Sequence, residues 1–93
     1  MRLRWTEEAL KDLGRLRFFL RKRNPDAAAR AGAKIRAAVR ALMRTPELGR
    51  VGEDDDLRRL VVPFGSSGYV ILYRLSEEEV VIARLWHGRE ERE

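Results

Sequence analysis

The residue types best suited to chemistry stand in the later part of this chain. Arg74 and Arg84 occupy two strand-like segments, and His87, the one histidine, follows the second of them. Arginine binds phosphate through charge-assisted hydrogen bonds, and histidine exchanges a proton near neutral pH. If the three side chains met on one face, they could bind a phosphate and protonate a leaving group. Pairing Leu75 with Val80 would turn the two arginines to opposite faces, and a one-residue bulge would bring them together.

Each of these residues also has a structural interpretation. An arginine in a strand often lays its aliphatic stem on apolar surface or pairs with an acidic neighbour, and a lone histidine at a strand end is more often structural than catalytic. The acidic run Glu53–Asp56 lacks the spaced ligands and the glycine of a calcium loop. Because the chain also has no cysteine, we expect neither a metal site nor a cofactor.

Length and charge limit what the chain can be. A chain of 93 residues supports one modest hydrophobic core, so residues 1–93 are expected to form a single domain. The formal net charge is +5, and the basic residues concentrate in residues 1–50, which favours nucleic acid or an acidic protein segment as a partner. No apolar run approaches the ~20 residues of a membrane-spanning helix, and residues 1–8 have no signal-peptide core. We therefore expect a cytoplasmic protein with no membrane partner.

A strand and two helices are predicted for the first half of the chain. Arg2–Trp5 alternates polar and apolar residues, as a short strand does. Thr6 is the expected N-cap of a helix that ends near Asn24–Pro25, and Asn24 caps a second helix that Thr45–Pro46 ends. Apolar residues recur at helical spacing in both helices: Ala9, Leu13, Leu16 and Leu20 in the first, and Ala28, Ala31, Ile35, Ala38 and Leu42 in the second. Because the link between them is very short, the two helices should form a hairpin.

Three strands are predicted after a loop over residues 46–56. They are Leu57–Val62, which Pro63 stops, Tyr69–Leu75 and Val80–Trp86. The short links between them require antiparallel pairing. The expected fold is a two-layer α+β domain of order β-α-α-β-β-β, with an N-terminal strand, the helical hairpin on one face of the sheet, and an antiparallel three-stranded meander. Because Tyr69–Leu75 is apolar on both faces, we expect a partner to cover the second face of the sheet.

Six segments spread along the chain resemble a known family. They are Trp5–Leu13, Asn24–Ala28, Pro46–Arg50, Arg59–Pro63, Gly68–Arg74 and Leu85–Arg89. In this order and spacing they resemble the ParE branch of the RelE/ParE superfamily of type II toxin–antitoxin toxins. The resemblance implies the fold given above, growth arrest by the free toxin, a part in plasmid stabilisation, and a cognate ParD-like antitoxin. It also implies a toxin–antitoxin hetero-oligomer in which a segment of the antitoxin, disordered when free, folds over the toxin.

Function divides within the superfamily that the chain resembles. ParE-like toxins are associated with inhibition of DNA gyrase, whereas RelE-like toxins are ribosome-dependent messenger RNA endonucleases. This chain has Val70 where RelE-like enzymes place an active-site arginine after Gly68 and Tyr69, and it has no tyrosine after Tyr73. With fewer cations beside it, a phosphate undergoing cleavage would lose much of its charge stabilisation. The resemblance therefore favours a gyrase inhibitor that acts by binding, without catalysis.

The same resemblance suggests residues for each role. For contact with the target we expect three residues at the last strand and the tail: Arg84, His87 and Arg89. For the antitoxin surface we expect residues of the helical hairpin and of a strand edge: Leu16, Phe19, Leu20 and Tyr73. The alternative function, a RelE-like mRNA endonuclease, would use Arg59, Arg74, Arg84 and His87.

Overall fold

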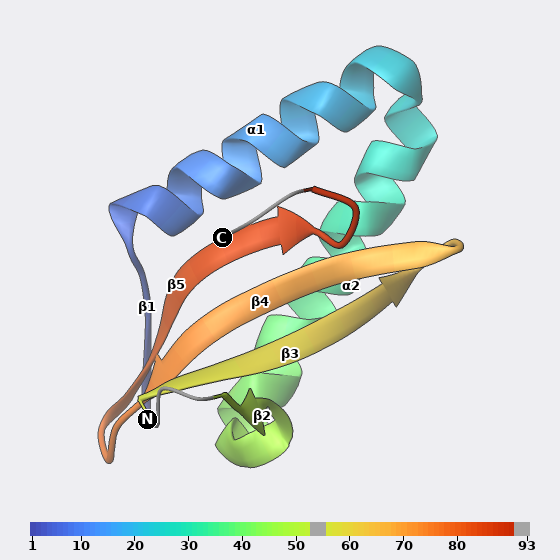
Figure 1. Ribbon diagram of the computed structural model, residues 1–93. Helices are drawn as coiled ribbons and strands as arrows, with labels where there is room; N and C mark the ends of the chain where they lie inside the picture. Colours follow the sequence, from blue (N-terminus) through green and yellow to red (C-terminus); the bar gives the residue numbers. More distant parts are fainter. Residues whose placement is uncertain (53–55, 91–93) are drawn as a thin grey trace.

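The computed structural model describes residues 1–52 and 56–90, and it arranges them as two helices packed on a sheet (Figure 1). In chain order the elements are β1 (Arg2–Trp5), α1 (Glu7–Arg23), α2 (Pro25–Arg44), the 3₁₀ turn η1 (Pro46–Leu48), β2 (Arg50–Val51), β3 (Leu57–Phe64), β4 (Ser67–Leu75) and β5 (Glu79–His87). The predicted α+β fold and its β-α-α-β-β-β order are confirmed, with the short strand β2 added. The acidic run Glu53–Asp56 falls mostly outside the described residues.

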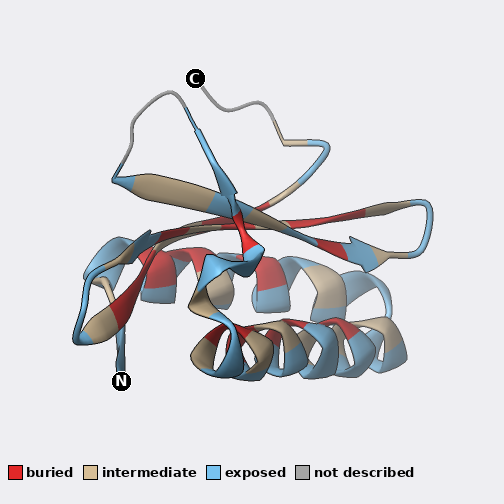
Figure 2. Cartoon of the chain, turned by 90° about the horizontal axis from the view of Figure 1, so that it is seen from below, coloured by how far each residue is buried: buried red, intermediate tan, exposed pale blue. Residues whose placement is uncertain are grey.

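The five strands form one sheet in the order β1-β5-β4-β3-β2. Strands β3, β4 and β5 pair antiparallel, as predicted, and the additional strand β2 pairs antiparallel with β3. Strand β1 lies parallel to β5 and pairs only with its first part, from Glu79 to Ile82. Both helices lie on the same face of this sheet (Figure 2). In the described chain no helix is both long and apolar enough to cross a membrane.

The two helices begin where the sequence predicts because a side chain caps each first turn. Thr6 Oγ1 accepts a hydrogen bond from Ala9 N–H at 3.1 Å, and Asn24 Oδ1 accepts one from Ala27 N–H at 3.1 Å. Asn24 also closes α1, since its own N–H donates to Leu20 O at 2.7 Å. One residue therefore ends the first helix and starts the second, which makes the hairpin sharp.

A β-bulge in β5 decides the register that the sequence left open. The pairing of β4 with β5 shifts by one residue in its middle, and Ala83 has no pairing partner in β4. Thr6 Oγ1 donates to the Ala83 carbonyl at 2.8 Å, so the bulge is tied to the start of α1. By register, the shift puts Arg84 on the same face of the sheet as Arg74, opposite the helices.

The prediction that Pro63 ends the strand beginning at Leu57 is wrong. Strand β3 continues to Phe64, and Pro63 lies in register opposite Gly68 of β4. Proline cannot donate a ladder hydrogen bond, but β2 pairs only with the early part of β3, so the outer side of β3 is an edge at this point. The chain then reverses through a two-residue turn in which Gly65 has a φ of +61°, a conformation that suits glycine.

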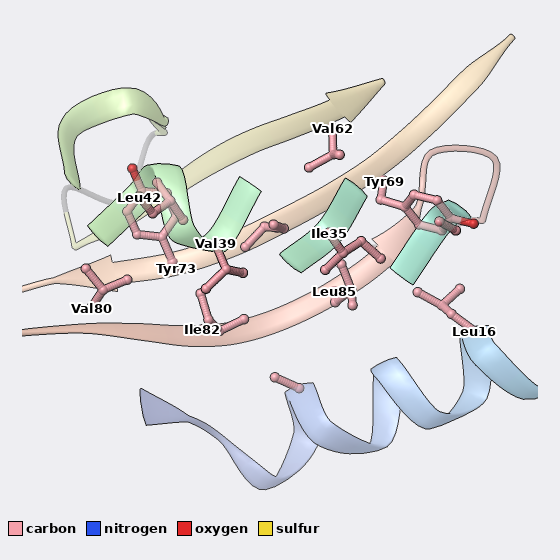
Figure 3. Close-up of a cluster of buried hydrophobic side chains, with 13 residues drawn as sticks. Leu16, Ile35, Val39, Leu42, Val62, Tyr69, Tyr73, Val80, Ile82 and Leu85 are labelled. Carbon is pink, nitrogen blue, oxygen red and sulfur yellow. The ribbon is translucent and has the colours of Figure 1, made fainter. Parts of the chain in front are cut away.

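The hydrophobic core lies between the sheet and the helices, and two tyrosines stand at its two ends on β4 (Figure 3). The Tyr73 hydroxyl donates to Pro46 O at 2.6 Å and accepts from Gly49 N–H at 2.7 Å. A Cβ atom at Gly49 would lie 2.5 Å from the Tyr73 ring, so glycine permits this close approach. Tyr73 thus fastens the turn after α2 to the sheet.

Replacing Tyr73 by phenylalanine should destabilise the fold by about 2 kcal/mol, because Pro46 O and Gly49 N–H would lose a buried partner. For a chain of this size each kcal/mol lowers the melting temperature by about 4–8 °C. Thermal unfolding followed by circular dichroism measures the shift. Tyr69→Phe is the matched control, because Tyr69 is equally buried and its hydroxyl makes no hydrogen bond to a described residue. Equal melting temperatures for the two variants would contradict the role given to the Tyr73 hydroxyl.

Candidate functional site

A hollow of about 490 Å³ opens between α1 and the segment that follows β5. We call it the α1–tail hollow. It is lined by Arg15, Leu16, Phe19 and Leu20 of α1, Tyr69 of β4, His87 of β5, and Arg89 and Glu90 beyond it. The lining combines apolar and aromatic side chains with charged ones, and such a mixture fits a partner segment that carries both kinds of group.

The position of α1 beside the hollow is set by Asp12, whose side chain is only 6% exposed. Its carboxylate accepts two hydrogen bonds from the Arg84 guanidinium, at 2.8 and 3.1 Å. It accepts a third from Leu85 N–H at 2.9 Å and a longer one from Arg15 at 3.3 Å. Beyond Ile82, β1 no longer pairs with β5, so the Asp12 carboxylate takes the place of a neighbouring strand at Leu85.

These contacts change the acidity of Asp12. Burial is the largest single influence and raises the pKa of the carboxyl, but hydrogen bonds from Arg84, Leu85 N–H and Arg15 together outweigh it. The net pKa of Asp12 therefore lies below its ordinary value of 3.8, and the group is a carboxylate throughout the neutral range. The Asp12–Arg84 pair consequently holds a full negative charge against a full positive one inside the fold.

The segment after β5 is folded back by Glu90. One carboxylate oxygen of Glu90 accepts from His87 N–H at 2.9 Å, and the other accepts from Arg15 at 2.6 Å. Arg89 N–H donates to His87 Nδ1 at 3.2 Å, so in this arrangement the ring proton of His87 sits on Nε2. These bonds fix the His87 ring and the Arg89 backbone at one wall of the hollow.

The floor of the hollow includes the Tyr69 side chain, which is 1% exposed. The His87 ring meets the Tyr69 ring edge to face, with centroids 5.3 Å apart. Burial, with a smaller contribution from the Glu90 charge, raises the pKa of the Tyr69 hydroxyl, which therefore stays protonated at neutral pH. Because the hydroxyl makes no hydrogen bond to a described residue, it is a donor at the floor that a bound partner can use.

The structure brings together most of the residues that the sequence assigned to two different roles. Five of them line the same hollow: Leu16, Phe19, Leu20, His87 and Arg89. Arg84 lies next to it, with its guanidinium held by Asp12. Tyr73 lies at the other end of β4 and is fully buried, so it is not part of this surface.

The residues suggested for a nuclease are not gathered in one place. By register, Arg59 and Arg74 belong to the sheet face opposite the helices, whereas His87 belongs to the helix-covered face with Tyr69. Arg84 starts from the opposite face by register, but its guanidinium reaches Asp12 of α1. On the opposite face, the Arg59 guanidinium lies 5.7 Å from the centroid of the Trp86 ring. That face still carries exposed apolar surface, since Val61 is 62% exposed.

Sequence reasoning missed four residues that build the site, namely Asp12, Arg15, Tyr69 and Glu90. A signal for Asp12 was present, because it is three residues after Ala9 and four before Leu16 and so lies on the apolar side of the first helix. A carboxylate on a buried stripe requires partners. The role of Glu90 is not visible in the sequence, since its ion-pair partner Arg15 lies 75 residues away and meets it only in the folded chain.

Comparisons with known proteins agree with one another. The family model described as ParE toxin of the type II toxin–antitoxin system, parDE, matches residues 3–92. Toxin RelE1 of Caulobacter vibrioides is 45% identical over 85 residues, covering 90% of this chain and 89% of that protein. Toxin RelE3 of the same organism is 42% identical over 84 residues, covering 90% of each chain. The putative toxin Y4kP of Sinorhizobium fredii is 39% identical over 90 residues, covering 97% of this chain and 91% of that one.

A solved structure shares the fold. It is a chain of a chromosomal ParDE TA system from P. aeruginosa, with a TM-score of 0.79 and 24% sequence identity, and the match covers 94% of this chain and 95% of that one. At this identity the match supports the arrangement of helices and strands described above.

Replacing Asp12 by asparagine should cost about 2 kcal/mol of unfolding free energy at pH 7, because charge-assisted bonds to Arg84 and Leu85 N–H are lost. Since the folded pKa of Asp12 is lowered, its stabilisation is present above the ordinary value of 3.8 and is lost as the pH falls through the folded pKa. The difference between wild type and variant should therefore shrink below about pH 4. Urea unfolding at pH 7 and at about pH 3 measures it.

Glu90→Gln is the matched control for Asp12→Asn, because it makes the same carboxylate-to-amide change at the exposed end of the same network. Its cost should stay below ~1 kcal/mol, as for other partly exposed ion pairs. A difference between wild type and Asp12→Asn that is the same at both pH values would contradict the charged state assigned to Asp12.

Proposed function

Because the chain belongs to the ParE toxin family of type II toxin–antitoxin systems, we propose that it arrests growth by binding DNA gyrase and that a ParD-like antitoxin neutralises it at the α1–tail hollow. The toxin acts as a binding protein in the cytoplasm. In the absence of the antitoxin the hollow contacts the target, and in the toxin–antitoxin hetero-oligomer the antitoxin covers it.

The observation that carries this proposal is that residues expected for target and antitoxin line one hollow. Phe19 is 52% exposed beside buried Leu16 and half-buried Leu20, while His87 and Arg89 come from the opposite wall. Two partners that need the same wall cannot bind at once. Neutralisation then follows from occupancy alone and needs no change in the toxin's fold.

The lining also indicates what an antitoxin segment must present. An aromatic or aliphatic side chain would pack on Phe19 and Leu20, where it is shielded from water. A carboxylate of the same segment would meet Arg89, and an acceptor at the floor would meet the Tyr69 hydroxyl. A segment that is disordered when free can supply these groups as it folds onto the toxin.

The positions of the arginines support action by binding. Stabilising a cleaved phosphate requires cations aimed at one point. Arg84 already gives two N–H groups to Asp12, and His87 belongs to the other face of the sheet from Arg59 and Arg74. This arrangement supplies no shared point for the four residues named for a nuclease.

A second candidate function is a ribosome-dependent mRNA endonuclease, favoured by the names Toxin RelE1 and Toxin RelE3 of two relatives. It would require His87 Nε2 to act without the arginines of the opposite sheet face. The two functions are distinguished by what the toxic protein damages, namely supercoiling in one case and messages in the other.

The test of the proposal is supercoiling of relaxed plasmid by purified gyrase, with the protein added alone or after mixing with its antitoxin. Inhibition that the antitoxin reverses is expected, and Arg89→Gln should raise the concentration for half-inhibition about tenfold, or ~1.4 kcal/mol of binding. Arg2→Gln, far from the hollow lining, should have no such effect. Unimpaired supercoiling together with cleaved messages in a translating extract would replace this proposal by the second candidate.

Phe19→Ala should weaken antitoxin binding about 30-fold, or ~2 kcal/mol, because an exposed aromatic anchor is lost from the hollow. Isothermal titration with the purified antitoxin measures the change. Phe18→Ala is the matched control: Phe18 is the adjacent residue of α1, is 59% exposed, and does not line the hollow. Each ring also lies near one cation, Arg23 for Phe19 and Lys22 for Phe18, so the two changes are alike on the helix. Equal losses would mean that the antitoxin does not use the hollow.

A further inference from the structure

The outward side of α2 carries a dense row of cations that the proposed function does not use. We call it the outer α2 face, and it comprises Arg30, Lys34, Arg36, Arg40 and Arg44. All five residues are exposed, whereas the buried stripe of the helix is formed by Ala31, Ile35, Val39 and Leu42. At about 100° per residue the five cations fall within one half of the helix circumference.

The charge of this face is not compensated by ion pairs with the described residues. None of the five side chains makes an ion pair or a hydrogen bond to another part of the described chain. Other cations of the chain are paired, such as Lys11 with Glu7 and Arg84 with Asp12. The acidic residue of α2, Asp26, stands in the first turn, one helical turn before Arg30 and away from Arg40 and Arg44.

The spacing along the helix fits a row of phosphates. Residues four apart rise by about 6 Å along the axis, so Arg30 and Lys34, and likewise Arg40 and Arg44, stand one helical turn apart. From Arg30 to Arg44 the face spans about 21 Å. A nucleic-acid duplex laid beside it presents roughly one phosphate charge per 1.7 Å of its axis, about twelve over that length.

The residues between the cations favour nucleic acid over a protein partner. The exposed positions next to them are alanines, Ala29, Ala33 and Ala37, which let a backbone approach closely. Protein interfaces depend on buried aromatic or long apolar anchors at their centre, and this face has none among its exposed residues. Contacts to a phosphate backbone need only donors, and arginine, with its planar fork, is the residue best suited to make them.

We propose that the outer α2 face is a binding surface for the sugar–phosphate backbone of duplex nucleic acid, separate from the α1–tail hollow. Binding there does not depend on base sequence, because contacts to phosphate and sugar carry no sequence information. It is governed by release of counterions and so weakens steeply with salt.

The experiment titrates the full chain against fluorescent duplexes of about 20 base pairs, one of DNA and one of RNA, from about 50 to about 200 mM salt. Fluorescence anisotropy should give an association constant whose logarithm falls linearly with the logarithm of salt concentration, with a slope of about −4.5 for five phosphate contacts on DNA. The triple variant Arg30→Gln, Arg40→Gln, Arg44→Gln should bind at least about tenfold more weakly and lose roughly two to three units of slope. Glutamine keeps the helix propensity of these positions.

The control is Arg2→Gln, Arg17→Gln, Arg21→Gln, which removes three exposed cations from β1 and α1 and lowers the net charge equally. It should lose less than one unit of slope. Binding to both duplexes, or to one alone, supports the proposal and names the nucleic acid. The proposal is overturned by equal losses in the two triple variants, by no binding at the lowest salt, or by tighter binding of a polyglutamate peptide than of either duplex. Melting temperatures within about 3 °C of wild type show that both variants are folded.

Discussion

Most of the site depends on the hydrogen bonds that one buried carboxylate accepts at the edge of the sheet. Strand β5 is bordered first by β1, then by Thr6, whose hydroxyl donates to the bulged Ala83, and finally by Asp12, which accepts from Leu85 N–H. Successive parts of the β5 edge thus receive their hydrogen bonds from β1, Thr6 and Asp12. Burying the Asp12 carboxylate costs solvation energy, which the hydrogen bonds that it accepts offset. The same hydrogen bonds fix the position of α1 along β5. The α1–tail hollow exists only in that position, because its two walls belong to α1 and to the end of β5.

The same carboxylate divides the cations of the protein into two groups. Arg84 and Arg15 are drawn into a network with Asp12 and Glu90, where their charges act on the protein itself. The cations of α2 have no such partners in the described part of the chain, so their charges face the solvent and any molecule that binds there. Counting basic residues in the sequence therefore gives a poor measure of what a partner meets. The Arg84 side chain is partly exposed, yet it has already given two donors to Asp12, whereas Arg40 has given none.

Sequence reasoning succeeded where the cause is local and failed where it is not. Thr6 and Asn24 could be recognised as caps because each bonds an amide three residues away. Pro63 was misread because its effect depends on whether the strand has an outer neighbour, which only the sheet order decides. The bulge at Ala83 could be named as an alternative but not chosen, since Thr6 stabilises it from across the chain. The sequence predicts residues that line the hollow, but it assigns them to two separate roles. It also assigns Tyr73 to the antitoxin surface, although strand alternation places Tyr73 on the same buried face as Tyr69.

The parallel pairing of β1 with β5 also has a consequence for folding during synthesis on the ribosome. Arg2 lies opposite Glu79, so an early strand finds its neighbour only after nearly all the described chain has been synthesised. Until then α1 has no sheet edge to lie against, and Asp12 has neither Arg84 nor Leu85 to bind. A chain that stops before β5 therefore lacks both the neighbour of β1 and one wall of the α1–tail hollow.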